Sequence, residues 1–471
     1  MSGPDKEPNG LKRTMKSRHM FMIALGGVIG SGLFLSTGLT LNQAGPGGAV
    51  LAYLIGGLTM YLVMLCLGEL SVVMPVAGSF QMYAAKFIGP ATGFMIGWMY
   101  WFSWALTVGL ELTSAGILMQ RWLPNSPVWV WVIVFGCLLF FLNSLSAKSF
   151  GESEFWTAGV KVIAIVLFII LGGAAMFGLI DMKGEASTPL FSHFVDDGGL
   201  FPNGITAVLL TMIAVNFSFQ GTELIGITAG ESENPGETIP KAIKNTGWRI
   251  IIFYVLTVVI LASLIPWKQA GALESPFVTV LDKIGVPFAA DIMNFVILTA
   301  MLSVANSALY ATTRMLWSLS SQSMASPIFK KLKRNGVPFN ALIASLAVAG
   351  LSLLSSVFAA DTVYAWLLSA SGVTAVIVWI SISASQFFFR RRFVAEGGKL
   401  EDLKFRTPLY PLVPILGFTL NSIVVISLAF IPDQRIVLYC GLPIIAFCYL
   451  YYHFRVKKVI EKKNGEQSMG M

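Results

Sequence analysis

The sequence predicts an all-α membrane protein with twelve transmembrane helices, and two observations carry this prediction. Of the 471 residues, 55% are hydrophobic and only 12% are charged, whereas soluble domains are about 25% charged. Apolar stretches of about 20 residues, the length at which a helix crosses a bilayer, follow one another along nearly the whole chain. We therefore expect a lipid bilayer around the protein and no separate soluble domain.

Each predicted helix corresponds to one apolar stretch. The stretches cover residues 20–41, 48–73, 92–120, 126–146, 155–180, 203–229, 247–266, 286–320, 338–359, 362–391, 410–431 and 434–455. The first is longer than the apolar core of a signal peptide and is not followed by a small-residue cleavage site, so we expect it to be retained. Short loops are expected between the helices.

Lysine and arginine are distributed unequally between the two sets of loops. With both termini in the cytoplasm, 26 of the 32 Lys and Arg residues lie in cytoplasmic segments and five lie outside. Because cytoplasmic loops carry an excess of these residues, the distribution predicts an even number of spans in a cell membrane with both termini cytoplasmic. The net charge of +8 is then a sign of orientation, and we expect no nucleic-acid partner.

Three ionisable residues, Glu111, Lys161 and Glu223, lie inside predicted helices. A charge near the bilayer centre costs at least about 2.5–3.5 kcal/mol, and it is usually kept because it faces a cavity, a partner or a substrate path. A buried structural ion pair is the alternative interpretation. We favour a protein that moves something small and polar across the membrane.

The first predicted helix contains four glycines within seven residues, namely Gly26, Gly27, Gly30 and Gly32. Each costs about 1 kcal/mol relative to alanine in a helix interior, so the helix is expected to break, with Gly30 and Gly32 in the non-helical segment. Close helix packing is an alternative interpretation. The four-residue spacing of Gly26 and Gly30 is consistent with it, whereas the positions of Gly27 and Gly32 are not. A dinucleotide-binding loop is excluded because no strand precedes the glycines.

The sixth predicted helix contains a polar cluster around a glycine, residues 216–223. Irregular backbone at bilayer depth occurs where it lines a cavity or is buried in protein. Breaks at corresponding positions of two halves indicate the binding site of a transporter. The two breaks are five helices apart, which predicts an inverted repeat of five plus five helices followed by two further helices.

Several motifs together resemble the bacterial amino acid permease family of the amino acid–polyamine–organocation superfamily, over about residues 11–455. The motifs are residues 27–34 (GVIGSGLF), 68–70 (GEL) with Pro75 and Gly78, 217–226 (FSFQGTELIG), 230–235 (GESENP) and 239–242 (IPKA). The resemblance implies the leucine-transporter fold and proton-coupled uptake of amino acids. It divides the chain into a cytoplasmic tail (1–19), a transporter core of ten helices (20–391), the last two helices with the preceding loop (392–455) and a second cytoplasmic tail (456–471).

Broken helices suit an amino acid zwitterion, which needs N–H groups for its carboxylate and C=O groups for its ammonium. The N–H groups of Ser31 and Gly32 begin the second half of the first helix and are suited to the carboxylate. The carbonyls of Val28 and of Phe217 or Ser218 are suited to the ammonium, and by resemblance Phe217 also closes over the ligand. The predicted substrate site comprises Val28, Ile29, Gly30, Ser31, Gly32, Glu111, Phe217, Ser218, Gln220, Gly221, Thr222 and Glu223.

Lys161 is expected about 10 Å into the fifth helix, where snorkelling to the cytoplasmic surface is one interpretation. In proton-coupled members of the family that the sequence resembles, a lysine here takes the place of the sodium ion, and its ammonium holds carbonyls of the first helix. Burial disfavours the charged form of a lysine, which suits it to release a proton in each cycle. We therefore predict Lys161 as the proton-coupling residue.

The substrate class rests on shorter signals. Residues 219–223, 104–107 and 119–122 resemble the lysine and arginine/ornithine branch of the family. We expect a proton-coupled importer of basic amino acids, with Glu111, alongside Glu223, facing the cationic side chain. An exchanger or an importer of neutral amino acids remains an alternative, and the oligomeric state is left open. An enzyme is disfavoured because the spans contain no nucleophile with a base and no metal cluster, so we expect no cofactor or metal.

Overall fold

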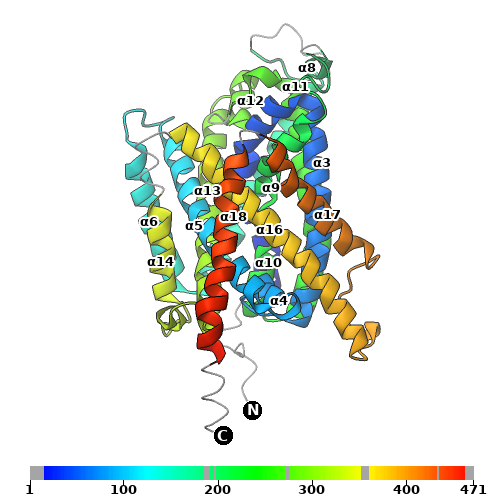
Figure 1. Cartoon of the computed structure of the whole chain (residues 1–471). Helices are drawn as coiled ribbons and strands as arrows, with labels where there is room; N and C mark the ends of the chain where they lie inside the picture. Colours follow the sequence, from blue (N-terminus) through cyan, green and yellow to red (C-terminus); the bar gives the residue numbers. More distant parts are fainter. Residues whose placement is uncertain are drawn as a thin grey trace.

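The structure is a computed structural model of the whole chain, and it describes residues 15–183, 191–195, 198–271, 275–351, 360–431 and 434–461. Most of the two predicted tails lies outside the described residues, and so do residues 352–359 of the ninth predicted helix. Figure 1 shows the helices running side by side in one bundle.

The described part of the chain is helical and contains no β-strand, only an isolated bridge between Met15 and Ser232. Within it, nine helical stretches are long and apolar enough to cross a membrane, and two shorter apolar stretches cover Ile251–Leu264 and Phe339–Gly350. These findings support the predicted multi-pass α-helical membrane protein. A helix overlaps each of the twelve predicted ranges, but the count of twelve spans and the inverted repeat stay predictions.

The helices fall into three groups by length and continuity. The long helices are α3 (Ser36–Val73), α5 (Pro90–Met119), α6 (Val128–Leu145), α7 (Ala147–Met176), α11 (Pro235–Leu264), α13 (Ala289–Ser321), α16 (Ala360–Ala395), α17 (Leu412–Ser427) and α18 (Arg435–Tyr451), the last continued by a π-helical turn, Tyr452–Val456. The pieces of the interrupted helices are α1 (Ser17–Gly26), α2 (Ser31–Phe34), α9 (Ala207–Phe219) and α10 (Leu224–Thr228). The remaining helices are α4 (Ser79–Phe87), α8 (Ser192–Val195), α12 (Pro276–Ile284) and α14 (Phe339–Gly350).

Several boundaries differ from the sequence-based ones. α7 begins at Ala147 and not at residue 155, and α11 begins at Pro235 and not at residue 247. Their first turns are polar, so apolar windows cannot detect them, whereas the proline at the first position of α11 favours helix initiation there. The expectation of loops alone between the spans is wrong, because α4 and α12 lie in two of the predicted loops.

The predicted loop between the first two spans is a kink within α3. Gly45 has φ 74° and ψ 177°, and Pro46 follows it inside the helix. A positive φ is readily adopted by glycine, and the proline removes a donor from the helical hydrogen bonds. The chain thus leaves the helical conformation at Gly45 and turns there from the first span into the second.

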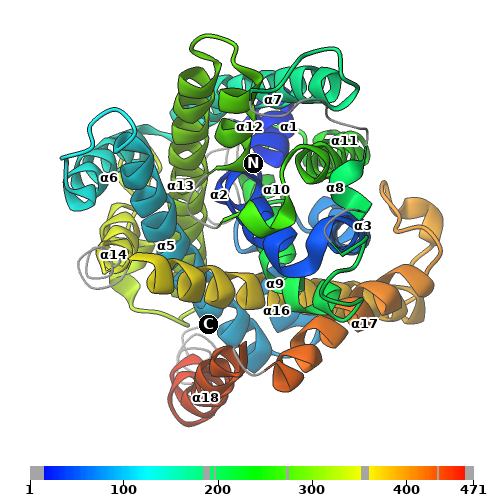
Figure 2. The ribbon, with the colours of Figure 1, turned by 90° about the horizontal axis from the view of Figure 1, so that it is seen from above.

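The interrupted helices lie in the middle of the bundle. Seen from above, α1, α2, α9 and α10 are surrounded by α3, α5, α7, α11, α13 and α16, with α6, α14, α17 and α18 further out (Figure 2). Large apolar side chains on the outer helices are exposed, including Phe141 on α6, Ile426 on α17 and Phe447 on α18. Such an outer surface suits contact with lipid, while the buried polar residues lie around the central helices.

A buried pair of an arginine and a carboxylate joins three segments of the bundle near the ends of α3 and α16. Arg390 on α16 donates from Nε to Oε1 of Glu69 on α3 at 2.8 Å and from Nη2 to Oε2. The same carboxylate accepts from Thr407 N at 2.6 Å and from Gln386 Nε2 at 3.1 Å. Since both charged groups are buried and every carboxylate oxygen is engaged, this pair links α3, α16 and the segment leading to α17.

We predict that Glu69→Gln lowers the thermal stability of the purified protein in detergent. Removing one partner of a buried ion pair leaves the other charge uncompensated, at a typical cost of about 3–5 kcal/mol. The matched control is Glu396→Gln, which breaks the pair of Arg392, in the last turn of α16, with Glu396, just after it. Both residues are well exposed, and the change is expected to cost less than about 1 kcal/mol. Equal melting temperatures for the two variants would contradict a structural role for the Glu69 pair.

Candidate functional site

The breaks of the first and sixth helices touch each other. Ser218 Oγ on α9 donates to Gly32 O on α2 at 2.6 Å. A Cβ added to Gly32 would lie 2.6 Å from Ser218 Cα, and a Cβ added to Gly221 would lie 2.5 Å from Gly27 O. Gly221 also has φ +107°, which favours glycine. Gly221 therefore allows the two irregular segments to approach each other closely, and Gly32 does the same for α2 and α9.

One detail of the predicted first break is wrong. The non-helical segment runs from Gly27 to Gly30, whereas Gly32 lies in α2. The helix resumes at Ser31 because Gly30 O accepts hydrogen bonds from the N–H groups of Leu33 at 3.1 Å and Phe34 at 3.0 Å. Glycine is required at position 32 by the contact with α9. Close packing also acts at Gly26, where an added Cβ would lie 2.2 Å from Ala158 Cβ on α7.

A buried tyrosine joins the carbonyls of the two breaks. Tyr254 OH on α11 lies 2.9 Å from Ser218 O and 3.1 Å from Val28 O, so its one proton is shared between the two carbonyls. Tyr53 OH on α3 lies 3.0 Å from Ser218 Oγ. The carbonyls predicted to hold a substrate ammonium are thus bonded to a hydroxyl of the protein in this structure.

Glu111 on α5 lies at the start of α2. Its Oε1 accepts from Ser31 Oγ at 2.6 Å and from Ser31 N at 3.4 Å, and the residue is 1% exposed. A Cβ on Gly30 would come within 3.1 Å of the same oxygen. Within the described residues, Glu111 Oε2 has no hydrogen-bond partner. A protein carboxylate therefore occupies the N–H group at which the substrate carboxylate is predicted.

Glu223 holds the second break together. Its Oε2 accepts from Gly221 N at 3.1 Å and from Trp379 Nε1 on α16 at 3.3 Å, and its Oε1 accepts from Tyr100 OH on α5 at 3.4 Å. The carboxylate thereby satisfies a backbone N–H released by the break and ties it to two neighbouring helices. Its oxygens are already engaged on three sides, so the geometry favours a positioning role for Glu223.

Lys161 contacts the first break directly. Its Nζ donates to Gly26 O at 2.6 Å and lies 3.7 Å from Oε1 of Glu154, which is on the same helix. Lys161 is 0% exposed and lies about 21 Å along α7 from Ala147. Snorkelling to the surface is therefore ruled out. The contact with a carbonyl of the first helix is the one that the family resemblance implied.

Gln220 links the second break to a polar cluster on α5 and α16. Its Oε1 accepts from Ser371 Oγ at 2.9 Å, and Ser371 in turn lies 2.7 Å from Thr107 Oγ1 and 3.2 Å from Ser103 Oγ. The remaining residues of the predicted site are buried in the same region, namely Ile29, Phe217 and Thr222.

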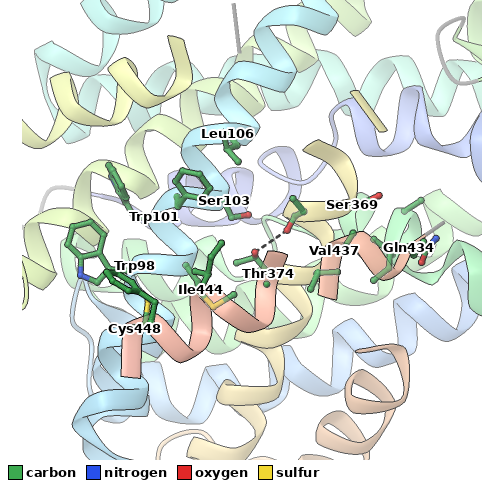
Figure 3. A pocket seen from close by; sticks show the side chains of 18 of the residues that line it. Trp98, Trp101, Ser103, Leu106, Ser369, Thr374, Gln434, Val437, Ile444 and Cys448 are labelled. Carbon is green, nitrogen blue, oxygen red and sulfur yellow. Dashed lines mark hydrogen bonds between the residues drawn. The ribbon is translucent and has the colours of Figure 1, made fainter. Parts of the chain in front are cut away.

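A large groove of about 1080 Å³ lies beside this cluster, between α5, α9, α16 and α18 (Figure 3). Ser103 and Thr374 contribute polar atoms to it, but most of its lining is apolar or aromatic, as with Trp98, Leu106 and Ile444. A zwitterion needs several polar partners at once. The groove is therefore unsuited to hold an amino acid, and the helix breaks remain the candidate site.

Sequence reasoning missed several residues of the site. Tyr254 and Trp379 lie in apolar stretches, where an aromatic residue gives no sign of the direction in which its polar atom points. Glu154 lies one residue before the fifth apolar stretch, 155–180, so the apolar pattern does not include it. A signal was present, since Glu154 and Lys161 are seven residues apart and share one face of a helix.

The chain is similar to known amino acid permeases over nearly its whole length. The sequence profile described as "Amino acid permease" matches residues 19–464. The chain is 65% identical over 463 residues to the amino-acid permease RocC of Bacillus subtilis, covering 97% of this chain and 98% of that protein. It is 60% identical to the amino-acid permease RocE of the same organism, covering 96% of each.

A more distant relative is named for its substrate, lysine. The lysine-specific permease LysP of Escherichia coli is 44% identical over 429 residues, covering 89% of this chain and 87% of that protein. The relatives are transporters and not enzymes, and the likeness to the basic amino acid branch is supported. On these grounds, the chain belongs to the amino acid permease family of multi-pass membrane transporters.

Proposed function

We propose that this permease imports basic amino acids together with protons, by alternating access around the broken first and sixth helices. The observation that carries the proposal is the contact of a fully buried ammonium, Lys161 Nζ, with Gly26 O at the first break, 2.6 Å away. A lysine can lose its charge, so the hold on the break can depend on a proton. The proposal includes twelve spans with the five-plus-five repeat and cytoplasmic termini.

The substrate is proposed to replace groups of the protein at the breaks. Its carboxylate would take the Ser31 N–H from Glu111, and its ammonium would take the carbonyls of Val28 and Ser218 from Tyr254. Two carboxylates cannot share one N–H group without strong repulsion. Glu111 must therefore turn away when the substrate binds, and its carboxylate is then free to pair with a cationic side chain.

The basic substrate class rests on this pairing and on the likeness to a lysine-specific relative. Glu111 is the proposed partner of the side chain, while Glu223 is held by three donors at its own break. Exchange of amino acids, or import of neutral ones, is the alternative if Glu111 stays on Ser31 throughout the cycle.

A second buried pair supports a closing motion at the proposed cytoplasmic end. Arg314 Nε on α13 donates to Glu231 Oε1 at 2.8 Å, and Tyr310 OH donates to the same oxygen at 2.8 Å. Met15 N donates to Glu231 O at 3.0 Å. The beginning of the first helix and the end of the sixth are thereby fastened to α13 at one place, which alternating access would have to release.

We predict that Lys161→Gln abolishes amino acid accumulation driven by a pH gradient in proteoliposomes. Lys161→Arg should have the same effect, because an arginine keeps its charge and cannot release the proton. Both proteins should remain folded, as judged by a monodisperse elution profile and a cooperative melting curve.

The matched control is Lys148→Gln, an exposed lysine at the start of the same helix, which should accumulate arginine as the wild type does. Wild-type accumulation by Lys161→Gln, with the gradient still required, would disprove the assignment of Lys161 as the coupling residue.

We predict that Glu111→Gln weakens competition by arginine, ornithine and lysine by tenfold or more, because a charge pair at about 4 Å contributes roughly 4 kcal/mol at an effective dielectric constant of 20. Competition by a neutral amino acid of similar length should change much less. The measurement is inhibition of radiolabelled uptake across a set of amino acids. An equal loss for neutral and cationic competitors would instead indicate that Glu111 acts on Ser31 alone.

We predict that Gly32→Ala abolishes stabilisation by substrate, since its Cβ would press on the backbone of Ser218 and separate the two breaks. Overpacking of this kind costs about 1–3 kcal/mol, so the ligand-free protein should melt somewhat earlier. The control is Gly173→Ala on α7, where an added Cβ meets nothing within 4 Å. A Gly32→Ala protein that arginine stabilises at wild-type concentrations would refute the proposed site.

A further inference from the structure

The part of the chain that the structure describes contains three buried pairs of a basic residue with a carboxylate inside the bundle. Two of them use arginine, namely Arg390 with Glu69 and Arg314 with Glu231. The third pairs Lys161 with Glu154, and Lys161 is the one lysine among the described residues that is buried. Arginine keeps its proton in proteins, whereas lysine and carboxylates can exchange theirs.

The third pair is also the loosest. The closest approach between Lys161 Nζ and Glu154 is 3.7 Å, whereas the arginine Nε atoms lie 2.8 Å from their carboxylates. Glu154 Oε1 accepts from Ser303 Oγ at 2.6 Å, but Glu154 Oε2 is buried without a hydrogen-bond partner among the described residues. Both oxygens of Glu69 are engaged in the Arg390 pair, which links three segments of the chain.

Glu154 lies between Lys161 and the proposed cytoplasmic end of α7. The two residues are seven positions apart, about two helical turns on one face. A Cβ on Gly26 would come within 2.2 Å of Ala158 Cβ and within 3.2 Å of Glu154 Oε1, so α1 covers this face of α7. A movement of α1 away from α7 would open Glu154 to water before it opened Lys161.

The groups around the pair offer no competing proton acceptor nearer to Lys161. From α1 it meets the carbonyl of Gly26, and α13 presents only the hydroxyl of Ser303 to Glu154. Glu111 on α5 interacts with Lys161 electrostatically, but its Oε1 is bonded to Ser31. Toward the start of α7, at Ala147, the next ionisable groups are Glu152 on α7 and His19 on α1. Glu152 Oε1 and His19 Nε2 are 3.1 Å apart.

We propose that Glu154 receives the proton that Lys161 releases and passes it toward the cytoplasm. In this step an N–H bond of the Lys161 ammonium breaks and an O–H bond forms on the Glu154 carboxylate, leaving a neutral amine and a neutral acid. The acid then gives its proton to cytoplasmic water, and Lys161 is recharged from the other side in the next cycle. The inference rests on the proposed coupling through Lys161 and adds the partner that such coupling requires.

The test compares net transport with exchange in proteoliposomes containing the full chain. Glu154→Gln keeps the size and hydrogen-bonding capacity of the side chain but cannot take a proton in this way. Accumulation of arginine under a pH gradient, and the proton influx reported by a dye inside the vesicles, are expected to fall roughly a hundredfold, the usual scale for losing a positioned proton acceptor. Exchange of labelled for unlabelled arginine, which needs no net proton transfer, is expected to stay near the wild-type rate.

A conservative variant and a control separate this role from a structural one. Glu154→Asp retains a carboxylate and should recover part of the accumulation that Glu154→Gln loses. Glu396→Gln, at an exposed position just after α16, should behave as the wild type. Accumulation by Glu154→Gln at the wild-type level would overturn the inference. Loss of exchange together with accumulation in both Glu154 variants would overturn it as well, because the residue would then be needed for the helical packing.

The same experiment distinguishes failure of this inference from failure of the proposed function. If the wild-type protein exchanges arginine but accumulates none under a pH gradient, proton coupling itself is wrong. If the wild type accumulates arginine and Glu154→Gln does so equally, only the role of Glu154 is wrong.

Discussion

The structure depends on one constraint: a helix that is broken at bilayer depth releases N–H and C=O groups that only the protein can satisfy. Each unsatisfied group would cost several kcal/mol in hydrocarbon. The chain meets this demand with buried side chains, three from the surrounding helices and one, Glu223, from the second break itself. Lys161 bonds to Gly26 O, Tyr254 to Val28 O and Ser218 O, Glu111 to Ser31 N, and Glu223 to Gly221 N. The rare ionisable residues at bilayer depth, Glu111, Lys161 and Glu223, thus each bond to a backbone group at a break.

These partners have the chemistry of the ligand that the site is proposed to bind. Glu111 presents a carboxylate to the N–H group at the start of α2, and Tyr254 presents a donor to the two carbonyls, as an amino acid would with its carboxylate and ammonium. The proposed substrate would remake each bond of the breaks with the same chemistry, while the displaced carboxylate and hydroxyl would need new partners. A permease needs this balance, since a substrate that gained too much at the breaks would not leave them.

The breaks themselves could be predicted from the sequence, because glycine density and polar clusters inside apolar stretches are local signals. Their partners could be predicted only where the partner is itself a rare residue at bilayer depth, as Lys161, Glu111 and Glu223 are. Tyr254 and Trp379 look like ordinary core residues until the fold brings their polar atoms to the breaks. Glu154 could not be predicted in this way, because the fifth apolar stretch begins at residue 155, one position after it. The reason for glycine at position 32 lies in Ser218, a contact that no local pattern contains.

The buried ion pairs described above use two kinds of basic residue. In the proposed mechanism, the arginine pairs stay charged and only the lysine gains and loses a proton. Arg390 and Arg314 bind carboxylates through fixed, charge-assisted hydrogen bonds at helix ends, and such bonds do not respond to a proton. At the first break the chain uses a lysine, in a loose pair with a carboxylate that has one oxygen unengaged. An arginine there would hold Gly26 O permanently and fix the first helix against α7. A neutral amine is a weaker hydrogen-bond donor than an ammonium, so the proposed loss of one proton from Lys161 would loosen α1 from α7.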